Sequence, residues 1–383
     1  MAAKANDQPK NAQAESAAFD SDWRPSALVW SLLEVSEKAA TIARECRARK
    51  KLFELLVQEK TGDEKNPRVL HDFKTLADVL VQETVKHHLC TKWPTLGPHI
   101  LGEENNSFTN AKGQCIVVEV KSNKSETLDL LEKVLDGNQA AATSLADAVH
   151  QEPDVAQAVR DDFERLREAL DERGRLPSLD DIGIWIDPID GTFEYVEGRW
   201  DSESSSADEP APHRFGLRCC TVLIGGFLRS TGAPIFSVVS QPFATPHGGP
   251  TTSFFCVRTV HNICELPVKF NIVVSSVERP DIREKLEQGF SVTEASAAGY
   301  KLLIVALGWC EAYVCSRGNT YRWDTCAPHA LLESQGGGIR RFDSNDPIHY
   351  NVSGKGDACN DGGFIAYRRE DVCRKILALL DIS

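Results

Sequence analysis

Two aspartates, Asp187 and Asp190, stand three residues apart directly after an apolar run at 182–186. The run predicts a strand that delivers Asp187 to its end, and Pro188 is expected to stop that strand because proline cannot donate a ladder hydrogen bond. In the turn that follows, Asp190 can come back to share one site with Asp187. Two carboxylates this close repel each other unless a cation lies between them. Mg2+, which prefers oxygen ligands, fits this pair together with the backbone carbonyl of Ile189.

The residues after Asp190 add a second element of chemistry. Gly191 and Thr192 are expected to open a helix, and the free N–H groups at a helix N-terminus can receive a phosphate group. Taken alone, the motif D-P-x-D-G-T is also compatible with a simple turn, since Asp-Pro and Asp-Gly are common turn dipeptides. The motif therefore needs support from other acidic residues.

Two further acidic segments give that support. Leu101–Glu104 places paired carboxylates, Glu103 and Glu104, at a glycine turn, and Trp323–Ala330 sets Asp324 inside an apolar stretch at an expected helix start. Each segment alone has an ordinary interpretation: a solvated loop for the glutamate pair and a helix N-cap for the aspartate. Their presence in the same chain as the first motif favours a site over a turn.

Helices and strands that alternate along the chain must position these residues. Apolar residues at helical spacing predict helices over 28–46, 155–170 and 372–380, and Thr75–Asp78 has the pattern of a capping box that begins another. Apolar β-type runs predict strands at 116–120, 182–186, 219–224, 235–239, 253–258, 271–275 and 364–367. The fold class is therefore α+β, with mixed sheets packed between layers of helices.

The chain is too long for one apolar core, because single cores stop growing at roughly 250–300 residues. Of its 383 residues, 1–22 are expected to form a disordered tail. We expect an N-terminal α+β metal-binding subdomain over 23–240, with a polar helical insertion at 121–181, and a C-terminal α/β substrate-binding subdomain over 241–383. The acidic stretch 201–212 is expected to be a mobile loop.

The composition restricts the partners. The chain has 43 basic and 56 acidic side chains, a formal net charge of −13, and no basic patch, so nucleic acid is not an expected partner. An anionic substrate needs cations supplied locally, by a few Lys or Arg side chains or by metal ions. The twelve cysteines include no C-x-x-C pair and lie mostly in apolar runs, which indicates free thiols in a reducing compartment. No apolar run approaches the roughly 20 residues of a membrane span. We expect a cytoplasmic monomer.

The three acidic segments, in this order, resemble the signatures of one family: the magnesium-dependent, lithium-sensitive phosphomonoesterases of the inositol monophosphatase and fructose-bisphosphatase type. Its members carry a Glu-Glu pair, then D-P-x-D-[GS]-T, then W-D-x-x-[AG]. The upstream D-x-K-T-x-x-D element of the family is present as well, at Asp72–Asp78. The resemblance runs from about Ala27 to the C-terminus, and it implies a layered αβαβα sandwich of the sugar-phosphatase type.

Within this superfamily, the sequence is most similar to the branch that acts on inositol polyphosphates. The likeness rests on the long gap between Glu103 and Asp187 and on the runs Val238–Phe243 and Ala298–Lys301. It implies removal of the 1-phosphate from inositol 1,4-bisphosphate and inositol 1,3,4-trisphosphate by a metal-activated water, with inhibition by Li+.

The resemblance also implies a role for each site residue. Two Mg2+ ions, or three, are expected to be held by five carboxylates and one backbone carbonyl: Asp72, Glu103, Asp187, Ile189, Asp190 and Asp324. Thr192 is expected to activate the attacking water with Asp72 as its partner, and Glu104 to hold a further metal-bound water. Substrate contacts are expected at Asp190, Gly191, Thr192, Ser275, Arg279, Ala297, Ala298 and Lys301.

Two alternatives stay open. A 3′(2′),5′-bisphosphate nucleotidase would use the same metal site, and Glu194–Gly198 resembles the corresponding segment of those enzymes. Turnover of inositol 1,4-bisphosphate beside 3′-phosphoadenosine 5′-phosphate would separate the two. The other alternative is a catalytically silent phosphate-binding protein, which is expected to have lost at least one ligand carboxylate. None of the five ligand carboxylates is lost from this sequence.

Overall fold

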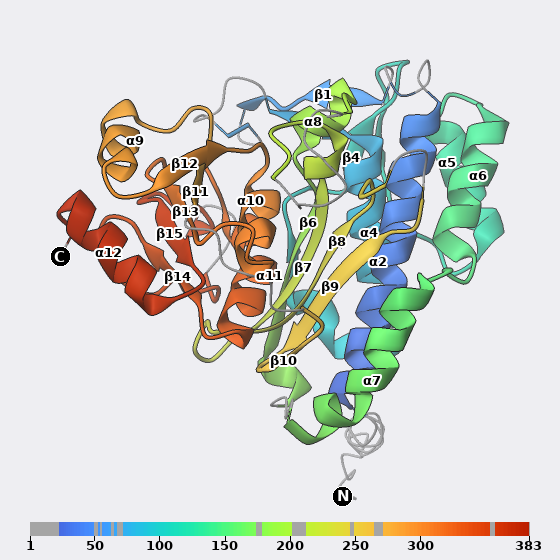
Figure 1. The fold of residues 1–383 in the computed structure, drawn as a ribbon. Coiled ribbons are helices and arrows are strands. Elements are labelled where there is room, and N and C mark those ends of the chain that lie inside the picture. The colour runs from blue at the N-terminus through green and yellow to red at the C-terminus, as the bar shows by residue number, and fades with distance from the viewer. Residues whose placement is uncertain are drawn as a thin grey trace, which may run out of the picture.

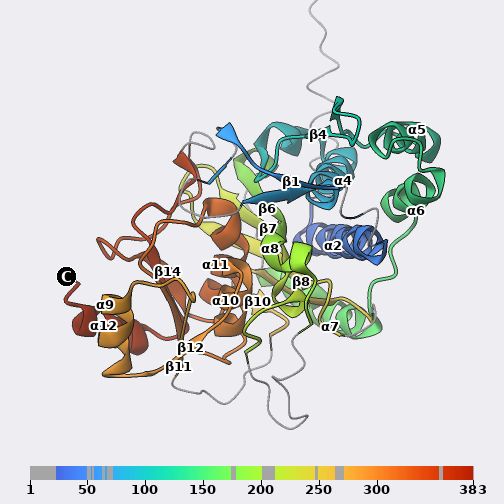
Figure 2. The ribbon, with the colours of Figure 1, turned by 90° about the horizontal axis from the view of Figure 1, so that it is seen from above.

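The computed structural model describes residues 23–49, 53, 56–62, 65–66, 72–173, 178–200, 212–245, 249–263, 271–352 and 357–382. The expected tail at 1–22 and nearly all of the acidic stretch 201–212 lie outside these residues. Across the described part of the molecule the layers follow in the order helices, large sheet, helices, small sheet and helices (Figures 1 and 2). The predicted α+β class and the αβαβα layering are confirmed.

The first helical layer contains α2 (Pro25–Ala48) and α4 (Leu76–Lys92), which pack against each other and against the large sheet. The predicted capping box at the start of α4 is confirmed: the Thr75 side chain accepts from the Asp78 N–H, and the Asp78 side chain accepts from the Thr75 N–H. Helices α5 (Lys124–Val134), α6 (Gln139–His150) and α7 (Gln157–Arg173) form the outermost group beside α2 (Figure 1).

The large sheet has the strand order β10-β9-β8-β7-β6-β3, and within it β3 and β6 are parallel while the other neighbours are antiparallel. Its strands are β3 (Ile100–Gly102), β6 (Ile182–Asp190), β7 (Thr221–Leu228), β8 (Pro234–Gln241), β9 (Thr252–Val257) and β10 (Val260–His261). Strands β6, β7 and β8 are buried almost throughout, because helices cover both faces of the sheet. This explains their continuous apolar runs.

Strand β6 does not end where the sequence predicts. The predicted stop at Asp187–Pro188 is wrong, because the strand continues to Asp190. The ladder with β7 pairs Asp187 with Leu223 and Asp190 with Thr221, and its register is irregular between these two pairs. Pro188 therefore stands in a bulge, where its missing N–H leaves no ladder bond unmade.

The second half of the chain builds the other three layers. Helices α10 (Ala298–Ala306) and α11 (Arg322–Ser334) lie between the two sheets, and α9 (Pro280–Glu287) and α12 (Glu370–Leu380) cover the far face of the small sheet. That sheet has the order β12-β11-β13-β15-β14. Its strands are β11 (Asn271–Val274), β12 (Ser291–Glu294), β13 (Ala312–Cys315), β14 (Gly338–Arg341) and β15 (Phe364–Tyr367).

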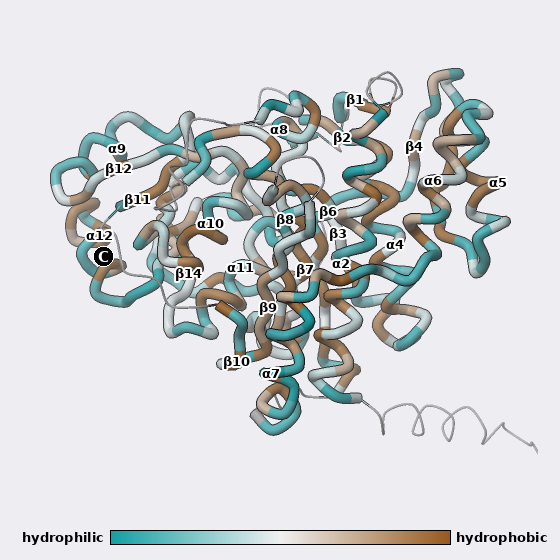
Figure 3. Tube along the Cα trace, turned by 45° about the vertical axis from the view of Figure 1, so that its right-hand side comes forward, coloured by the Kyte–Doolittle hydropathy of each residue, from teal (hydrophilic) through white to brown (hydrophobic). Residues whose placement is uncertain are grey.

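Apolar side chains fill the spaces between these layers. Figure 3 shows apolar residues along β9, β11 and α10, whereas the outer helix α7 alternates between apolar and polar residues. The large sheet also includes β9 and β10, so the chain passes from one sheet to the other between His261 and Asn271. In the part of the chain that the structure describes, no helix combines the length and apolar character needed to cross a membrane.

Short elements complete the fold near the edge of the large sheet. The antiparallel pair β1 (Val57–Glu59) and β2 (Phe73–Thr75) leads into α4. A second pair joins β4 (Ser107–Thr109) to β5 (Cys115–Val117), which is shorter than the strand predicted over 116–120. The remaining elements are three short 3-10 helices and one short α-helix: η3 (Pro94–His99), η4 (Leu179–Asp181), η5 (Leu217–Cys219) and α8 (Thr192–Glu197).

Candidate metal and phosphate site

Three carboxylates from two elements meet between the sheets. Asp187 and Asp190 come from the end of β6, and Asp324 comes from the first turn of α11; one oxygen of each lies within 4.8 Å of the others. Asp324 is fixed by its own helix start, since its Oδ2 accepts a hydrogen bond from the Tyr321 N–H at 2.5 Å. It therefore caps the helix from the third helical position while its carboxylate also joins the cluster.

Burial makes this cluster unfavourable without a cation. Burial first, and then the charges of neighbouring carboxylates such as Glu103, raises the pKa of Asp187 well above its usual range, and the pKa of Asp324 is raised in the same way. Among the described residues, Oδ1 of Asp187 is buried without a hydrogen-bond partner. Several carboxylate oxygens that lie close together, one of them without a hydrogen-bond donor, form the kind of ligand set that a hard divalent cation prefers. The residues therefore fit Mg2+.

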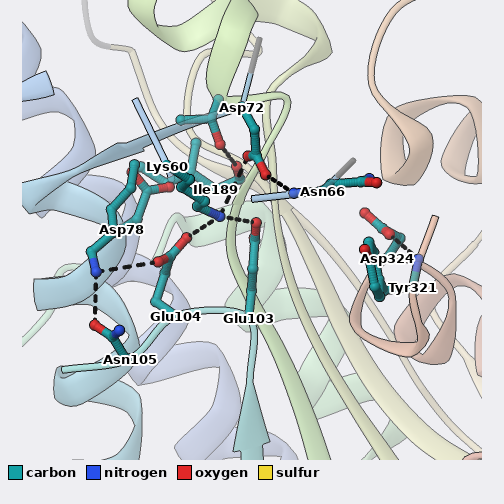
Figure 4. A network of polar contacts seen from close by, with 12 residues as sticks. Lys60, Asn66, Asp72, Asp78, Glu103, Glu104, Asn105, Ile189, Tyr321 and Asp324 are labelled. Atoms are coloured by element: carbon teal, nitrogen blue, oxygen red, sulfur yellow. Dashed lines mark hydrogen bonds and ion pairs between the residues drawn. The ribbon is translucent and has the colours of Figure 1, made fainter. Parts of the chain in front are cut away.

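A lysine lies beside the glutamate pair (Figure 4). The Nζ of Lys60 is 2.6 Å from Oε1 of Glu103, 2.6 Å from Oε1 of Glu104 and 3.6 Å from Oδ1 of Asp72. The backbone N–H of Glu103 donates to the Ile186 carbonyl at 3.1 Å, which fixes the pair relative to β6. No local sequence pattern marks Lys60 as a site residue, because only the pairing of β1 with β2 brings it to the carboxylates.

The two ends of the Asp72–Asp78 segment have different surroundings. Asp72 is partly buried, pairs with Lys60 and accepts a hydrogen bond from the Asn66 N–H at 2.7 Å. Asp78 is fully buried: its Oδ2 accepts from the N–H and the hydroxyl of Thr75, and its Oδ1 has no partner among the described residues. Burial raises the pKa of Asp78 to about 7. Asp78 thus offers a free oxygen that can take a proton near neutral pH, a role that the sequence analysis did not give it.

The buried acids predict how metal-free stability depends on pH. Burial, followed by the charge of Glu103, raises the pKa of Glu104 to about 8, and burial raises that of Asp78 to about 7. Between about pH 7 and 8 the folded state then holds protons that the unfolded chain has released, so the free energy of unfolding should fall as the pH rises. Histidines such as His88 contribute little to the change in stability between pH 7 and 8, because burial lowers the pKa of His88 well below that range.

Urea unfolding at both ends of that window, with a chelator present, measures the effect. Saturating Mg2+ should reduce the fall, because the ion stabilises the charged carboxylates. A free energy of unfolding that rises with pH in the chelator would contradict this account of the cluster.

Glycine at position 191 suits the turn after β6. Gly191 has a φ of 83°, and a Cβ atom there would stand 2.9 Å from the Cβ of Ala297. The residue therefore permits both the left-handed backbone that starts α8 and the close approach of the segment before α10. Thr192 follows it, and its hydroxyl donates to the Ile189 carbonyl at 3.0 Å. This bond holds the carbonyl that the sequence analysis assigned to a metal ion.

Asp190 joins the cluster to the start of α10. Its Oδ1 accepts from the Ala298 N–H at 3.1 Å, and its Oδ2 accepts from the Thr221 hydroxyl at 3.0 Å. The buried Lys301 donates from Nζ to the Ala297 carbonyl at 2.7 Å. Three of the expected substrate contacts, at 297, 298 and 301, are thus placed next to a carboxylate of the cluster.

The remaining expected substrate contacts lie at the end of β11. The Ser275 hydroxyl accepts from the Val277 N–H at 3.5 Å. Arg279 is exposed, and its guanidinium binds both carboxylate oxygens of Asp281, at 3.2 and 2.6 Å. The Arg279 side chain therefore forms an ion pair with Asp281, and a phosphate group would have to displace the Asp281 carboxylate in order to bind Arg279.

Comparison with known proteins identifies the family. The sequence matches the inositol monophosphatase family over residues 116–372, about two thirds of the chain. It is 38% identical to an inositol polyphosphate 1-phosphatase of Mus musculus, covering 90% of this chain and 94% of the mouse protein. The chain belongs to the inositol monophosphatase family. Membership in this metal-dependent family makes it a phosphatase, and the carboxylate cluster lies among the matched residues.

Two further comparisons concern the fold and the nucleotidase alternative. A solved extragenic suppressor protein from Bartonella henselae has a TM-score of 0.53 at 13% identity, covering 92% of this chain and 98% of that one, and shows the same fold. A 3′(2′),5′-bisphosphate nucleotidase of Dictyostelium discoideum is 28% identical, but the matched region covers only 49% of this chain and 60% of that protein. A Homo sapiens nucleotidase is 24% identical and covers 85% of this chain, so the nucleotidase interpretation is supported by relatives that are less similar than the inositol polyphosphate 1-phosphatase.

Proposed function

We propose that this chain removes the 1-phosphate from inositol 1,4-bisphosphate and inositol 1,3,4-trisphosphate. The observation that carries the proposal is the buried cluster of Asp187, Asp190 and Asp324 beside the start of α10. It occurs in a chain with 38% identity to an inositol polyphosphate 1-phosphatase over nearly its whole length. The nucleotidases that match this chain are less similar, at 28% identity over 49% of the chain and 24% identity over 85% of it.

The proposed cofactor is Mg2+, with two ions held by Glu103, Asp187, Asp190, Asp324 and the Ile189 carbonyl. Asp72 is proposed to recruit a third ion. When bound, Mg2+ supplies positive charge that stabilises phosphate oxygens and makes a water more acidic. The raised pKa values of the buried aspartates and the unpartnered Oδ1 of Asp187 support these residues as ligands. Li+ is proposed to inhibit the enzyme, as the family resemblance implies.

The residues of the chain complete the reaction site. We propose that Oδ1 of Asp78 accepts the proton of the attacking water, since this oxygen is free and the pKa of the carboxyl is near 7. Thr192 is proposed to orient the water, and Glu104 to hold a further water beside it. Lys301 and the backbone at Ala297 and Ala298 would bind the substrate next to Asp190.

A phosphate-release assay tests the proposal. Inositol 1,4-bisphosphate and 3′-phosphoadenosine 5′-phosphate are supplied in parallel, each with and without Mg2+ and Li+. The proposal expects Mg2+-dependent, Li+-inhibited turnover with the inositol bisphosphate strongly preferred. Preference for the nucleotide would establish the nucleotidase instead, and no turnover of either substrate would leave a phosphate-binding protein.

We further propose that the enzyme works in the cytoplasm as a monomer. The cysteines that the structure describes are all free, as expected in a reducing compartment. Size-exclusion chromatography with light scattering tests the oligomeric state, and a mass near twice that of the chain would contradict it.

A further inference from the structure

The turn that carries Asp324 is held from a distant part of the chain. Asn360 is 2% exposed, and its Nδ2 donates to the Tyr321 carbonyl at 2.9 Å and to the Thr320 hydroxyl at 3.2 Å. The same Nδ2 lies 3.5 Å from the Thr325 hydroxyl. The Asn360 backbone N–H donates to the Thr320 carbonyl at 2.8 Å. One buried amide thus contacts residues on both sides of Asp324.

Arg322 fastens the same turn from its other side. Its guanidinium donates to the side-chain oxygen of Asn360 and, through Nε, to the His349 carbonyl at 2.7 Å. Its backbone N–H donates to the Ala358 carbonyl at 2.8 Å. Within the described residues no carboxylate forms an ion pair with this buried guanidinium, so Asn360 is a principal acceptor for it. The amide is therefore oriented by Arg322, with its oxygen toward the guanidinium and its nitrogen toward the turn.

These contacts bear directly on a carboxylate of the cluster. The Tyr321 N–H donates to Oδ2 of Asp324, while the Tyr321 carbonyl accepts from Asn360 and from the Thr325 hydroxyl. These bonds hold the two peptide groups that flank the Tyr321 Cα, and a rotation of the backbone at Tyr321 would move Asp324 away from Asp187 and Asp190. Because Mg2+ demands nearly ideal octahedral geometry, a small displacement of one ligand weakens the whole site.

We infer that Asn360 is a positioning residue for the metal centre, which holds the Tyr321–Thr325 turn so that Asp324 meets the aspartates of β6. The inference rests on the proposed metal site. Asn360 itself contacts no carboxylate of the cluster in the structure; it acts through the backbone and hydroxyl groups of the turn. Residues that orient metal ligands in this way commonly change metal affinity by about 10–100-fold when removed.

The test measures Mg2+ binding to the full chain by titration calorimetry, with Asn360→Ala compared to the unaltered protein. The expected result is Mg2+ affinity weakened about tenfold, with turnover largely recovered at saturating Mg2+. Asn262→Ala is the matched control: Asn262 is also buried, accepts from the Phe255 N–H at 2.8 Å and donates to the Ser253 carbonyl at 3.0 Å, on the outer strands of the large sheet. The Asn262→Ala variant should have a lower free energy of unfolding but an unchanged Mg2+ affinity.

A second variant guards against a folding defect. Asn360→Asp keeps the size of the side chain and the acceptor for Arg322 but removes the donors to the turn, so it should weaken Mg2+ binding as Asn360→Ala does. Mg2+ affinity within twofold of the unaltered protein in either folded variant would overturn the inference. If the unaltered protein itself bound no Mg2+, the proposed metal site would fail instead, and the two failures are therefore distinguishable.

Discussion

Asp187→Asn is expected to lower phosphatase turnover by about a thousandfold or more while leaving the metal-free melting temperature unchanged or raised. The loss follows because a carboxylate ligand of a metal that stabilises the transition state by several kcal/mol is removed. The gain in stability follows because burial, and then repulsion by Glu103, Asp190 and Asp324, disfavours the ionised form of Asp187 when no cation is present. A neutral amide of the same size removes that repulsion.

The measurement combines turnover of inositol 1,4-bisphosphate at saturating Mg2+ with thermal unfolding in a chelator. Glu311→Gln is the matched control, because both oxygens of this buried carboxylate also lack a partner among the described residues. Glu311 immediately precedes β13, whereas the loop that leads to Asp324 follows that strand. The control should keep turnover. Near-normal turnover of Asp187→Asn would show that the carboxylates of β6 are not the metal site.

Sequence reasoning located the carboxylate cluster because its members belong to short motifs. Asp187 and Asp190 lie within four residues of each other, and a bulge in β6 is enough to bring both to one place. The apolar runs were also sufficient for the layered fold, since continuous apolar strands require helices on both faces. The end of β6 was mispredicted because a proline is tolerated wherever the ladder is already irregular.

The residues that surround the cluster could not be predicted in the same way. Lys60 reaches Glu103 and Glu104 through the pairing of β1 with β2, and Asn360 reaches the Asp324 turn from a loop beside β15. Both contacts join positions that are far apart in sequence, and neither residue has a local pattern that marks it. The net charge was also a poor guide to the charge of the substrate. The chain has a formal net charge of −13, but several of its acidic side chains gather where bound metal ions can make the site attractive to phosphate.

Asp78→Asn is expected to lower turnover about a hundredfold or more, whereas Asp72→Asn should lower it less than about tenfold. Asp72 is the first residue of the short D-x-K-T-x-x-D motif and Asp78 is the last. Only Asp78 is fully buried with an oxygen free to accept a proton, whereas Asp72 already pairs with Lys60 and accepts a hydrogen bond from the Asn66 N–H. The amide at position 78 can still accept from Thr75, so the start of α4 should lose no more than about 1 kcal/mol.

Turnover at saturating Mg2+, together with the Mg2+ affinity of each variant, separates the roles of the two aspartates. A proton acceptor affects turnover and its dependence on pH while leaving Mg2+ affinity nearly unchanged, so Asp78→Asn should also remove the acidic limb of the profile of kcat/KM against pH. If Asp72→Asn caused the larger loss instead, the water would be activated from the end of the motif that the family resemblance suggested. Burial would then be the weaker guide, because the more buried aspartate would serve only to cap the helix.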